Sequence, residues 1–202
     1  MLYVIKPEKK QSLDISFEDI LDHRLDFARS EGLTIHLDET GHDDLDTQDT
    51  TYLAYKDPVH GLIGSARLLP KESLPSDLKC ELPDQSIPFV LADCLFHLPE
   101  SRYFEKYSSD VAQSHFSHLV QTFYVSIAIY LENRAIQDQT PYIYFRLSEE
   151  DFDFMSRYLK REMYVLKEIQ TPSEFENAYL GAFDFSDLIY SSCDQKGDFA
   201  GI

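Results

Sequence analysis

The segment "TQDTTYLAYKDPVHGLIGSARLLP", from Thr47 to Pro70, predicts two β-strands joined by a tight turn. Its two halves are rich in β-branched and aromatic residues, and the residues from Asp57 to His60 between them are typical of a hairpin turn. Arg67 is unexpected, because it is a charged residue in a run that otherwise predicts a buried strand. Burying an unpaired charge costs several kcal/mol, so the Arg67 guanidinium must have an acidic partner.

The most obvious partners lie directly upstream, where residues 38–49, "DETGHDDLDTQD", include six carboxylates among twelve residues. Two interpretations are open: a solvated acidic loop that pairs with Arg67 only to stabilise the strand, or a ligand site whose carboxylates Arg67 holds beside a cleft. The stretch "DDLDTQDTTY", residues 43–52, lacks the central glycine and terminal glutamate of a calcium loop, so we predict no metal there.

Elsewhere the pattern predicts an alternation of helices and strands. Helices are expected at 16–30, 110–134 and 149–161, and strands at 33–37, "PYIYFRL", "MYVLKEI" and "AYLGAFDFS". The apolar segment "IPFVLADCLFHL" suits either a buried strand or a short helix. This order predicts an α/β layer arrangement in a single domain over residues 1–202, with a flexible tail at 191–202.

The composition limits the classes of partner. The chain has 202 residues and a formal net charge of -18, which argues against nucleic acid as a ligand. It permits a cationic small molecule, although an acidic surface also serves simple solubility. No run is long and apolar enough to span a membrane, no signal peptide is evident, and the three cysteines are widely spaced. We therefore expect a soluble cytoplasmic protein with no membrane partner.

Residues 43–70 resemble the acyl-homoserine lactone synthases, the enzymes that make bacterial quorum-sensing signals. An acidic D-x-x-D element (Asp43, Asp46) is followed by "DTTYL", a short hairpin and "GSARLLP", which is similar to the family's acidic motif, T-Y-L strand and R-L-L-P strand. The resemblance implies an acetyltransferase-like (GNAT-like) fold, with a mixed central sheet flanked by helices. It also implies an acyltransferase that joins S-adenosylmethionine to an acyl group carried by acyl carrier protein, with no cofactor.

The resemblance also assigns roles to residues. It implies Glu100, Asp46 and Arg67 as catalytic residues, with Glu105 as a competing candidate for the base. It implies that Arg24, Phe27, Asp43 and Arg102 bind substrate. Because acyl carrier protein is acidic, the sequence's own basic cluster is the candidate docking surface: Arg157, Lys160 and Arg161, with Lys167 nearby.

Several positions depart from the family pattern. Leu33 stands where the family has tryptophan, His23 where it has the helix arginine, and the "ESRYF" segment (Glu100 to Phe104) is one residue short of E-x-S-R-F. Two other functions therefore stay open. One is an N-acyltransferase of the same fold that acylates another amine, such as an amino acid. The other is a degenerate acidic binding or regulatory module.

Overall fold

The computed structural model describes residues 1–7, 14–30, 47–74, 79, 81–82, 89–98, 109–169 and 178–189. The elements with both ends among these residues are, in chain order, β1 (Leu2–Ile5), α1 (Phe17–Ser30), β2 (Thr51–Asp57), β3 (Gly61–Pro70), the 3-10 turn η1 (Lys71–Ser73), β4 (Phe89–Phe96), α4 (Ser109–Asp138), β5 (Tyr142–Ser148), α5 (Glu149–Leu159), β6 (Met163–Ile169) and β7 (Ala178–Asp184). The strand predicted at 33–37 and the tail predicted at 191–202 lie outside the described residues.

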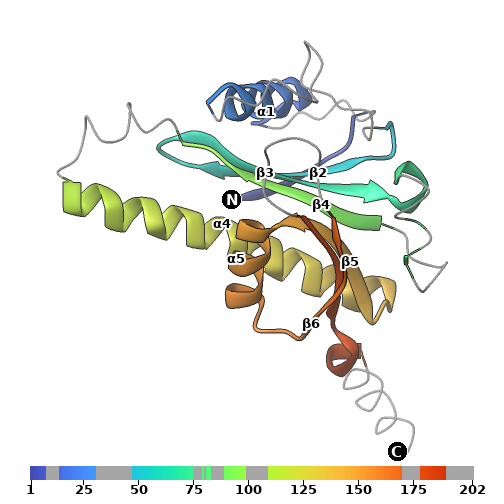
Figure 1. Ribbon diagram of the computed structural model, residues 1–202. Coiled ribbons are helices and arrows are strands. Elements are labelled where there is room, and N and C mark those ends of the chain that lie inside the picture. The colour runs from blue at the N-terminus through green and yellow to red at the C-terminus, as the bar shows by residue number, and fades with distance from the viewer. Residues whose placement is uncertain are drawn as a thin grey trace, which may run out of the picture.

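The described strands form one mixed sheet in the order β1-β2-β3-β4-β5-β7-β6 (Figure 1). Neighbouring strands are antiparallel except β4 and β5, which run parallel and are connected through the long helix α4. A parallel pair needs such a crossover because the chain must return to the same end of the sheet. This mixed sheet with flanking helices confirms the predicted fold class.

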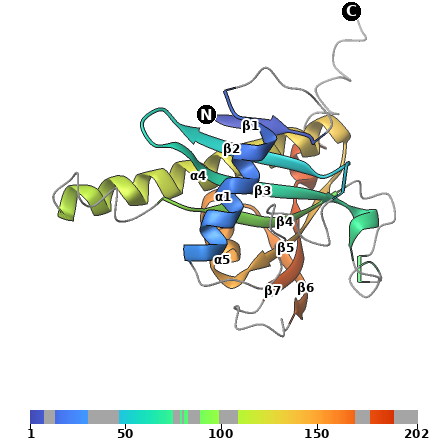
Figure 2. The same ribbon diagram turned by 90° about the horizontal axis from the view of Figure 1, so that it is seen from above.

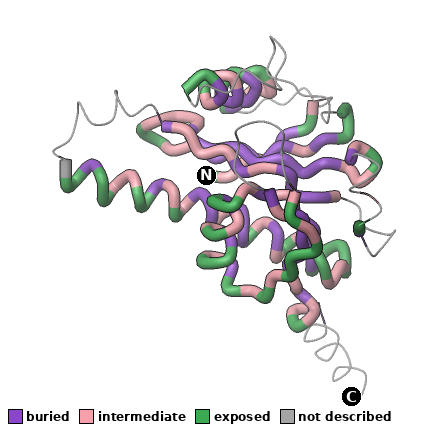
Figure 3. Tube along the Cα trace, in the orientation of Figure 1, coloured by how far each residue is buried: buried purple, intermediate pink, exposed green. Residues whose placement is uncertain are grey.

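Helices cover both faces of the sheet. Helix α1 lies across β2, β3 and β4 on one face, and α4 and α5 lie on the other (Figures 1 and 2). Side chains alternate accordingly along β2: Tyr52 and Ala54 pack in the cluster with α1, whereas Leu53 and Tyr55 pack in the cluster with α4. Buried positions are concentrated in the sheet and on the sides of the helices that face it (Figure 3).

The β2–β3 hairpin has the predicted turn chemistry. Asp57 accepts hydrogen bonds at Oδ1 from the backbone N–H groups of Val59 (2.9 Å) and His60 (3.0 Å). Gly61 follows with a φ of 79°, a conformation that L-residues with side chains rarely adopt. Farther along β3, a Cβ atom on Gly64 would lie 2.5 Å from the Phe123 ring, so this glycine lets α4 approach the sheet closely.

Side-chain caps fix where two of the helices begin. Ser16 Oγ accepts from the Asp19 N–H (3.1 Å), while Asp19 accepts from the Ser16 N–H (2.7 Å), a reciprocal pair that starts α1. Ser148 Oγ accepts from the Asp151 N–H (3.1 Å) at the start of α5, and Lys160, in the left-handed conformation, ends that helix. The predicted starts of both helices are confirmed, and α5 ends two residues earlier than expected.

The sheet opens between β4 and β5. These two fully described strands share only two ladder pairs, Val90 with Tyr144 and Leu91 with Phe145. β4 continues five residues beyond Leu91 and keeps its pairing with β3, while β5 keeps its pairing with β7. The β4 edge beyond Leu91 therefore has no β5 ladder partner, and we call this opening the strand split.

The structure decides one alternative that the sequence left open and adds one strand that was not predicted. "IPFVLADCLFHL" forms strand β4, which decides between the strand and the short helix. β1 was not predicted, because "LYVI" is only four residues long and its strand character depends on antiparallel pairing with distant β2. No helix in the described ranges is both long and apolar enough to cross a membrane.

Candidate functional site

The partner that the structure gives to Arg67 is Asp93, which lies opposite it on β4. Arg67 Nε donates to Asp93 Oδ2 at 2.6 Å, and Nη2 of the same guanidinium also contacts that oxygen. The Arg67 residue is only 3% exposed. A β-bulge between Arg67 and Leu68 shifts the ladder at this point, a feature that redirects side chains near functional sites.

A second guanidinium reaches the same carboxylate from helix α1. Arg24 Nη1 lies 3.6 Å from Asp93 Oδ2, and Arg24 is 2% exposed. The Arg24 guanidinium also lies 5.9 Å from the centre of the Tyr52 ring, a cation–π contact with β2. Asp93 therefore links strand β3 and helix α1 through a single carboxylate oxygen.

The two oxygens of Asp93 have different environments. Oδ2 holds the contacts with both arginines, whereas Oδ1 is buried and has no hydrogen-bond partner among the described residues. A buried carboxylate oxygen without a donor is unfavourable unless something else occupies it. Asp93 Oδ1 is thus an acceptor suited to an N–H group of a bound ligand.

Histidines extend the polar layer between α1 and the sheet. His23 is 7% exposed, its Nδ1 lies 3.4 Å from Ser65 Oγ, and its ring packs edge-on against His97 with centres 6.0 Å apart. Burial, with His97 as a second cause, lowers the pKa of His23 to about 4. His23 is therefore a neutral imidazole at neutral pH, with Nε2 buried and no hydrogen-bond partner for it within the described part of the chain.

On the other face of the sheet, a buried acid lies at the strand split. Tyr124 of α4 donates to Asp151 Oδ1 of α5 at 2.5 Å, and Asp151 is 9% exposed. Burial raises the pKa of Asp151 to about 7, and the charge of Asp93 adds to the shift. Burial, followed by the charges of Asp151 and Asp93, also raises the pKa of the Cys94 thiol on β4. The two acids therefore lie within electrostatic range of each other across β4.

The structure brings together some of the predicted site residues. Arg67 and Arg24 share Asp93, and Phe27 packs edge-on against His97 with ring centres 6.2 Å apart. The other predicted catalytic and substrate-binding residues lie outside the described residues: Asp43, Asp46, Glu100, Arg102 and the competing Glu105. Their roles stay predictions. Among the described side chains, no group of three or more His, Cys, Asp or Glu residues could hold a metal ion.

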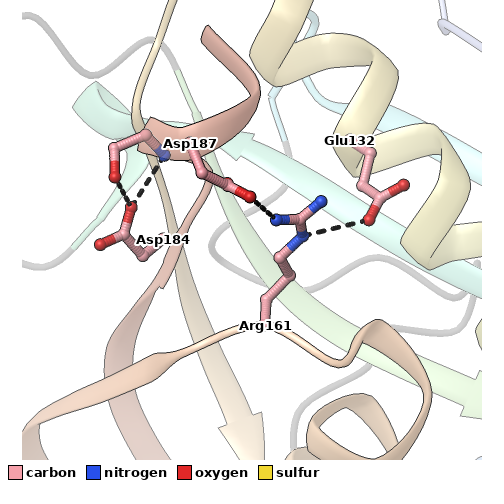
Figure 4. A network of polar contacts seen from close by, with 5 residues as sticks. Glu132, Arg161, Asp184 and Asp187 are labelled. Atoms are coloured by element: carbon pink, nitrogen blue, oxygen red, sulfur yellow. Dashed lines mark hydrogen bonds and ion pairs between the residues drawn. The ribbon is translucent and has the colours of Figure 1, made fainter. Parts of the chain in front are cut away.

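The predicted docking residues have different surroundings. Arg161 is engaged internally: it lies 3.4 Å from Glu132 of α4 and 2.5 Å from Asp187, which follows β7 (Figure 4). Lys167 pairs with Glu81 at 3.0 Å. Arg157 and Lys160 are exposed, and the Arg157 guanidinium lies 5.7 Å from the centre of the Phe154 ring. Arg157 and Lys160 are therefore the more accessible part of this basic cluster.

Sequence reasoning missed Asp93 and looked for the partner of Arg67 only upstream. The signal was present, because Asp93 is the one charged residue in "FVLADCLF", just as Arg67 is in "GLIGSARLL". Two opposite charges, each alone in an apolar strand, predict a cross-strand pair. What the sequence could not supply was the register that places these two residues opposite each other.

Comparison with known proteins places this geometry on a known fold. No protein-family model and no curated protein sequence matches the chain. Among solved structures, TofI in a ternary complex with an inhibitor and MTA has a TM-score of 0.55 at 14% identity, covering 91% of each chain. BjaI, described as a CoA-dependent acyl-homoserine lactone synthase, has a TM-score of 0.58 at 13% identity over 95% of this chain and 88% of BjaI.

A third structure, the CoA-dependent acyl-homoserine lactone synthase MesI, has a TM-score of 0.54 at 14% identity, covering 100% of this chain and 97% of MesI. These likenesses show that the chain has the fold of acyl-homoserine lactone synthases over nearly its whole length. The resemblance read from residues 43–70 is thereby confirmed at the level of the fold.

The buried His23 imidazole can be tested through the pH dependence of the protein's stability. The folded state holds His23 neutral down to about pH 4, whereas the unfolded chain takes up the proton near 6.5. The unfolded state then binds more protons, so the stability contribution is full above pH 6.5 and is lost as pH falls toward 4. The loss should be on the order of 2–3 kcal/mol.

We expect His23→Asn, which keeps a polar atom near Ser65, to unfold in urea with a weaker acid dependence than wild type between pH 6.5 and 4. His118→Asn, at an exposed position of α4, should keep the wild-type dependence. If the free energy of unfolding depended on pH in the same way in wild type and His23→Asn, the prediction that His23 is buried as a neutral imidazole would be contradicted.

Proposed function

We propose that this protein is an acyltransferase that makes N-acyl-homoserine lactone from S-adenosylmethionine and an acyl thioester. The fold supports the class of enzyme, and TofI and BjaI, which share it, have been solved with MTA. BjaI has also been solved with SAM and isopentyl-CoA. The reaction has two steps, in which the amine of S-adenosylmethionine takes the acyl group and lactone closure then expels methylthioadenosine.

The observation that carries the proposal is the ion pair of buried Arg67 with half-buried Asp93, with buried Arg24 as third member. S-adenosylmethionine presents an α-amine and an α-carboxylate on adjacent positions, together with a sulfonium cation. Asp93 Oδ1 provides an acceptor for the amine. The acidic loop that includes Asp43 and Asp46 would attract the sulfonium cation.

In this proposal Asp93 replaces Glu100 as the base. The amine nitrogen attacks the thioester carbonyl carbon, the C–N bond forms, the C–S bond breaks, and the amine proton must go to an acceptor within hydrogen-bond reach. Asp93 Oδ1 is buried beside the strand split, whereas Oδ2 is held by Arg67. The guanidinium contacts thus orient the Asp93 carboxylate, and its Oδ1 atom takes the amine proton directly or through a water molecule.

The strand split is the proposed entry for the acyl donor. Backbone N–H and C=O groups along the β4 edge beyond Leu91 lack a β5 ladder partner, and an extended chain with its own amide groups could satisfy them. The phosphopantetheine arm has this character. It is shared by coenzyme A and acyl carrier protein, so both are candidate donors.

The direct test is a product assay. Wild-type protein incubated with S-adenosylmethionine and acyl thioesters of several chain lengths should release methylthioadenosine and N-acyl-homoserine lactone, as measured by mass spectrometry. Asp93→Asn, nearly equal in shape, should lower kcat at least about 100-fold because the proton acceptor is lost. The matched control Asp153→Asn, at an exposed position of α5, should retain wild-type activity.

Other outcomes of the same assay would replace the proposal. Acylation of another amine without methylthioadenosine release would identify an N-acyltransferase that uses an acceptor other than S-adenosylmethionine. Binding of S-adenosylmethionine, detected as a rise in Tm without any product, would identify a binding module. Full activity in Asp93→Asn would mean that Asp93 only stabilises the fold.

A second prediction separates the two donor classes. Arg157→Glu with Lys160→Glu should raise the KM for acyl carrier protein thioesters at least several-fold, because long-range attraction to an acidic partner becomes repulsion. The KM for a small neutral N-acetylcysteamine thioester should not change. Equal KM values for carrier-bound donor in the variant and in wild type would exclude this docking surface.

A further inference from the structure

The mechanism above gives no role to the buried pair of Tyr124 and Asp151. Tyr124 extends from the middle of α4, and Asp151 lies in the first turn of α5, directly after β5 ends. Their side chains meet at 2.5 Å, and Tyr124 is also stacked on Phe154 with ring centres 4.8 Å apart. Stacking and hydrogen bonding fix the phenol so that it holds one oxygen of the carboxyl group.

The pair lies beside the strand split. Asp151 directly follows β5, the strand that separates from β4 at the split. Its charge nevertheless acts on Cys94, a β4 residue three positions beyond Leu91, where the pairing with β5 ends. Asp93 precedes Cys94 on β4, and its side chain contacts arginines of α1 and β3. Two carboxyl groups therefore flank β4 at the split, one toward α1 and one toward α4 and α5.

Their surroundings suit opposite tasks. Asp93 has two guanidinium groups beside it, whereas Asp151 forms its hydrogen bonds within the described residues with two uncharged side chains, Tyr124 and Ser148. The charged groups that act on Asp151 are Asp93 and Glu150, both of which favour its neutral form. Two acids whose environments differ in this way are suited to accept a proton at one position and donate it at another.

We propose that Asp151, held by Tyr124, is the general acid that protonates the sulfur of the departing thiol during acyl transfer. This inference rests on the proposed function. Because Tyr124 donates to Oδ1, the better acceptor, the carboxyl proton of the neutral acid resides on Oδ2. When the C–S bond breaks, its electron pair stays on sulfur, which takes this proton and leaves as a neutral thiol.

Asp93 takes up one proton and Asp151 gives up one, so the reaction needs no other proton donor or acceptor. Asp151 is left as a carboxylate that the Tyr124 hydroxyl stabilises, and Asp93 holds the proton released by the amine. Transfer of one proton from Asp93 to Asp151 through solvent restores both groups. No oxidant, metal or further reactant is needed.

The competing explanation is that Asp151 only stabilises the first turn of helix α5, where its backbone N–H donates to the capping residue Ser148. The two explanations differ in how activity depends on the leaving thiol. An alkyl thiolate is strongly basic and needs a proton as it departs, whereas an aryl thiolate is a weak base and departs without one. A helix cap would matter equally for both donors.

The experiment compares an N-acetylcysteamine thioester with a thiophenyl ester of the same acyl group, using S-adenosylmethionine as acceptor. Tyr124→Phe and Asp151→Asn should lower kcat for the alkyl donor about 100-fold and for the aryl donor less than about threefold. Tyr130→Phe, another tyrosine of α4, should leave both rates unchanged.

Each other outcome overturns the inference. Equal losses with both donors would make Asp151 a structural residue, and no loss with either would leave the pair without a part in the reaction. A wild-type protein that makes no product from either donor would instead overturn the proposed function itself, and this inference with it. Circular dichroism of the variants identifies those that fail to fold, and Asp151→Glu, which keeps the acid, should recover part of the alkyl-donor rate.

Discussion

The structure depends on one half-buried carboxylate, Asp93, that holds two buried guanidinium groups in place. Arg67 comes from the adjacent strand β3, and Arg24 comes from helix α1 on the face of the sheet. Removing one partner of such a buried pair typically costs about 3–5 kcal/mol, because the remaining charge loses its counterion. The same contacts that attach α1 to the sheet leave one Asp93 oxygen without a donor among the described residues.

This ion-pair cluster lies at β4, where the pairing of neighbouring strands changes from antiparallel to parallel. On one side of β4 the strands are antiparallel, and on the other side β4 and parallel β5 separate after two ladder pairs. A sheet interior that opens in this way exposes backbone polar groups to a ligand while its neighbours keep the opening rigid. The polar cluster under α1 and the acid held by Tyr124 lie on opposite faces of the sheet, and the proposed reaction takes its base from one and its acid from the other.

Much of the fold could be predicted from local pattern. The hairpin, with its Asp57 turn, and helices α1, α4 and α5, with their caps and apolar faces, are determined by neighbouring residues, so the sequence alone locates them. β1 and the choice between strand and helix at β4 depend on pairing with distant segments, which no local pattern contains. For the site, Arg24 and Arg67 were predicted from the family resemblance and lie together. Asp93 was missed because its importance follows from strand register, and Asp151 because an acid in the first turn of a helix looks ordinary in sequence.

The most direct test of the account is a crystal structure of the protein with S-adenosylmethionine bound. The account predicts that the ligand's α-amino nitrogen lies within hydrogen-bond distance of Asp93 Oδ1, with Arg67 still bonded to Oδ2. Ligand bound elsewhere, with the Asp93 carboxylate enclosed and distant from the amine, would contradict it.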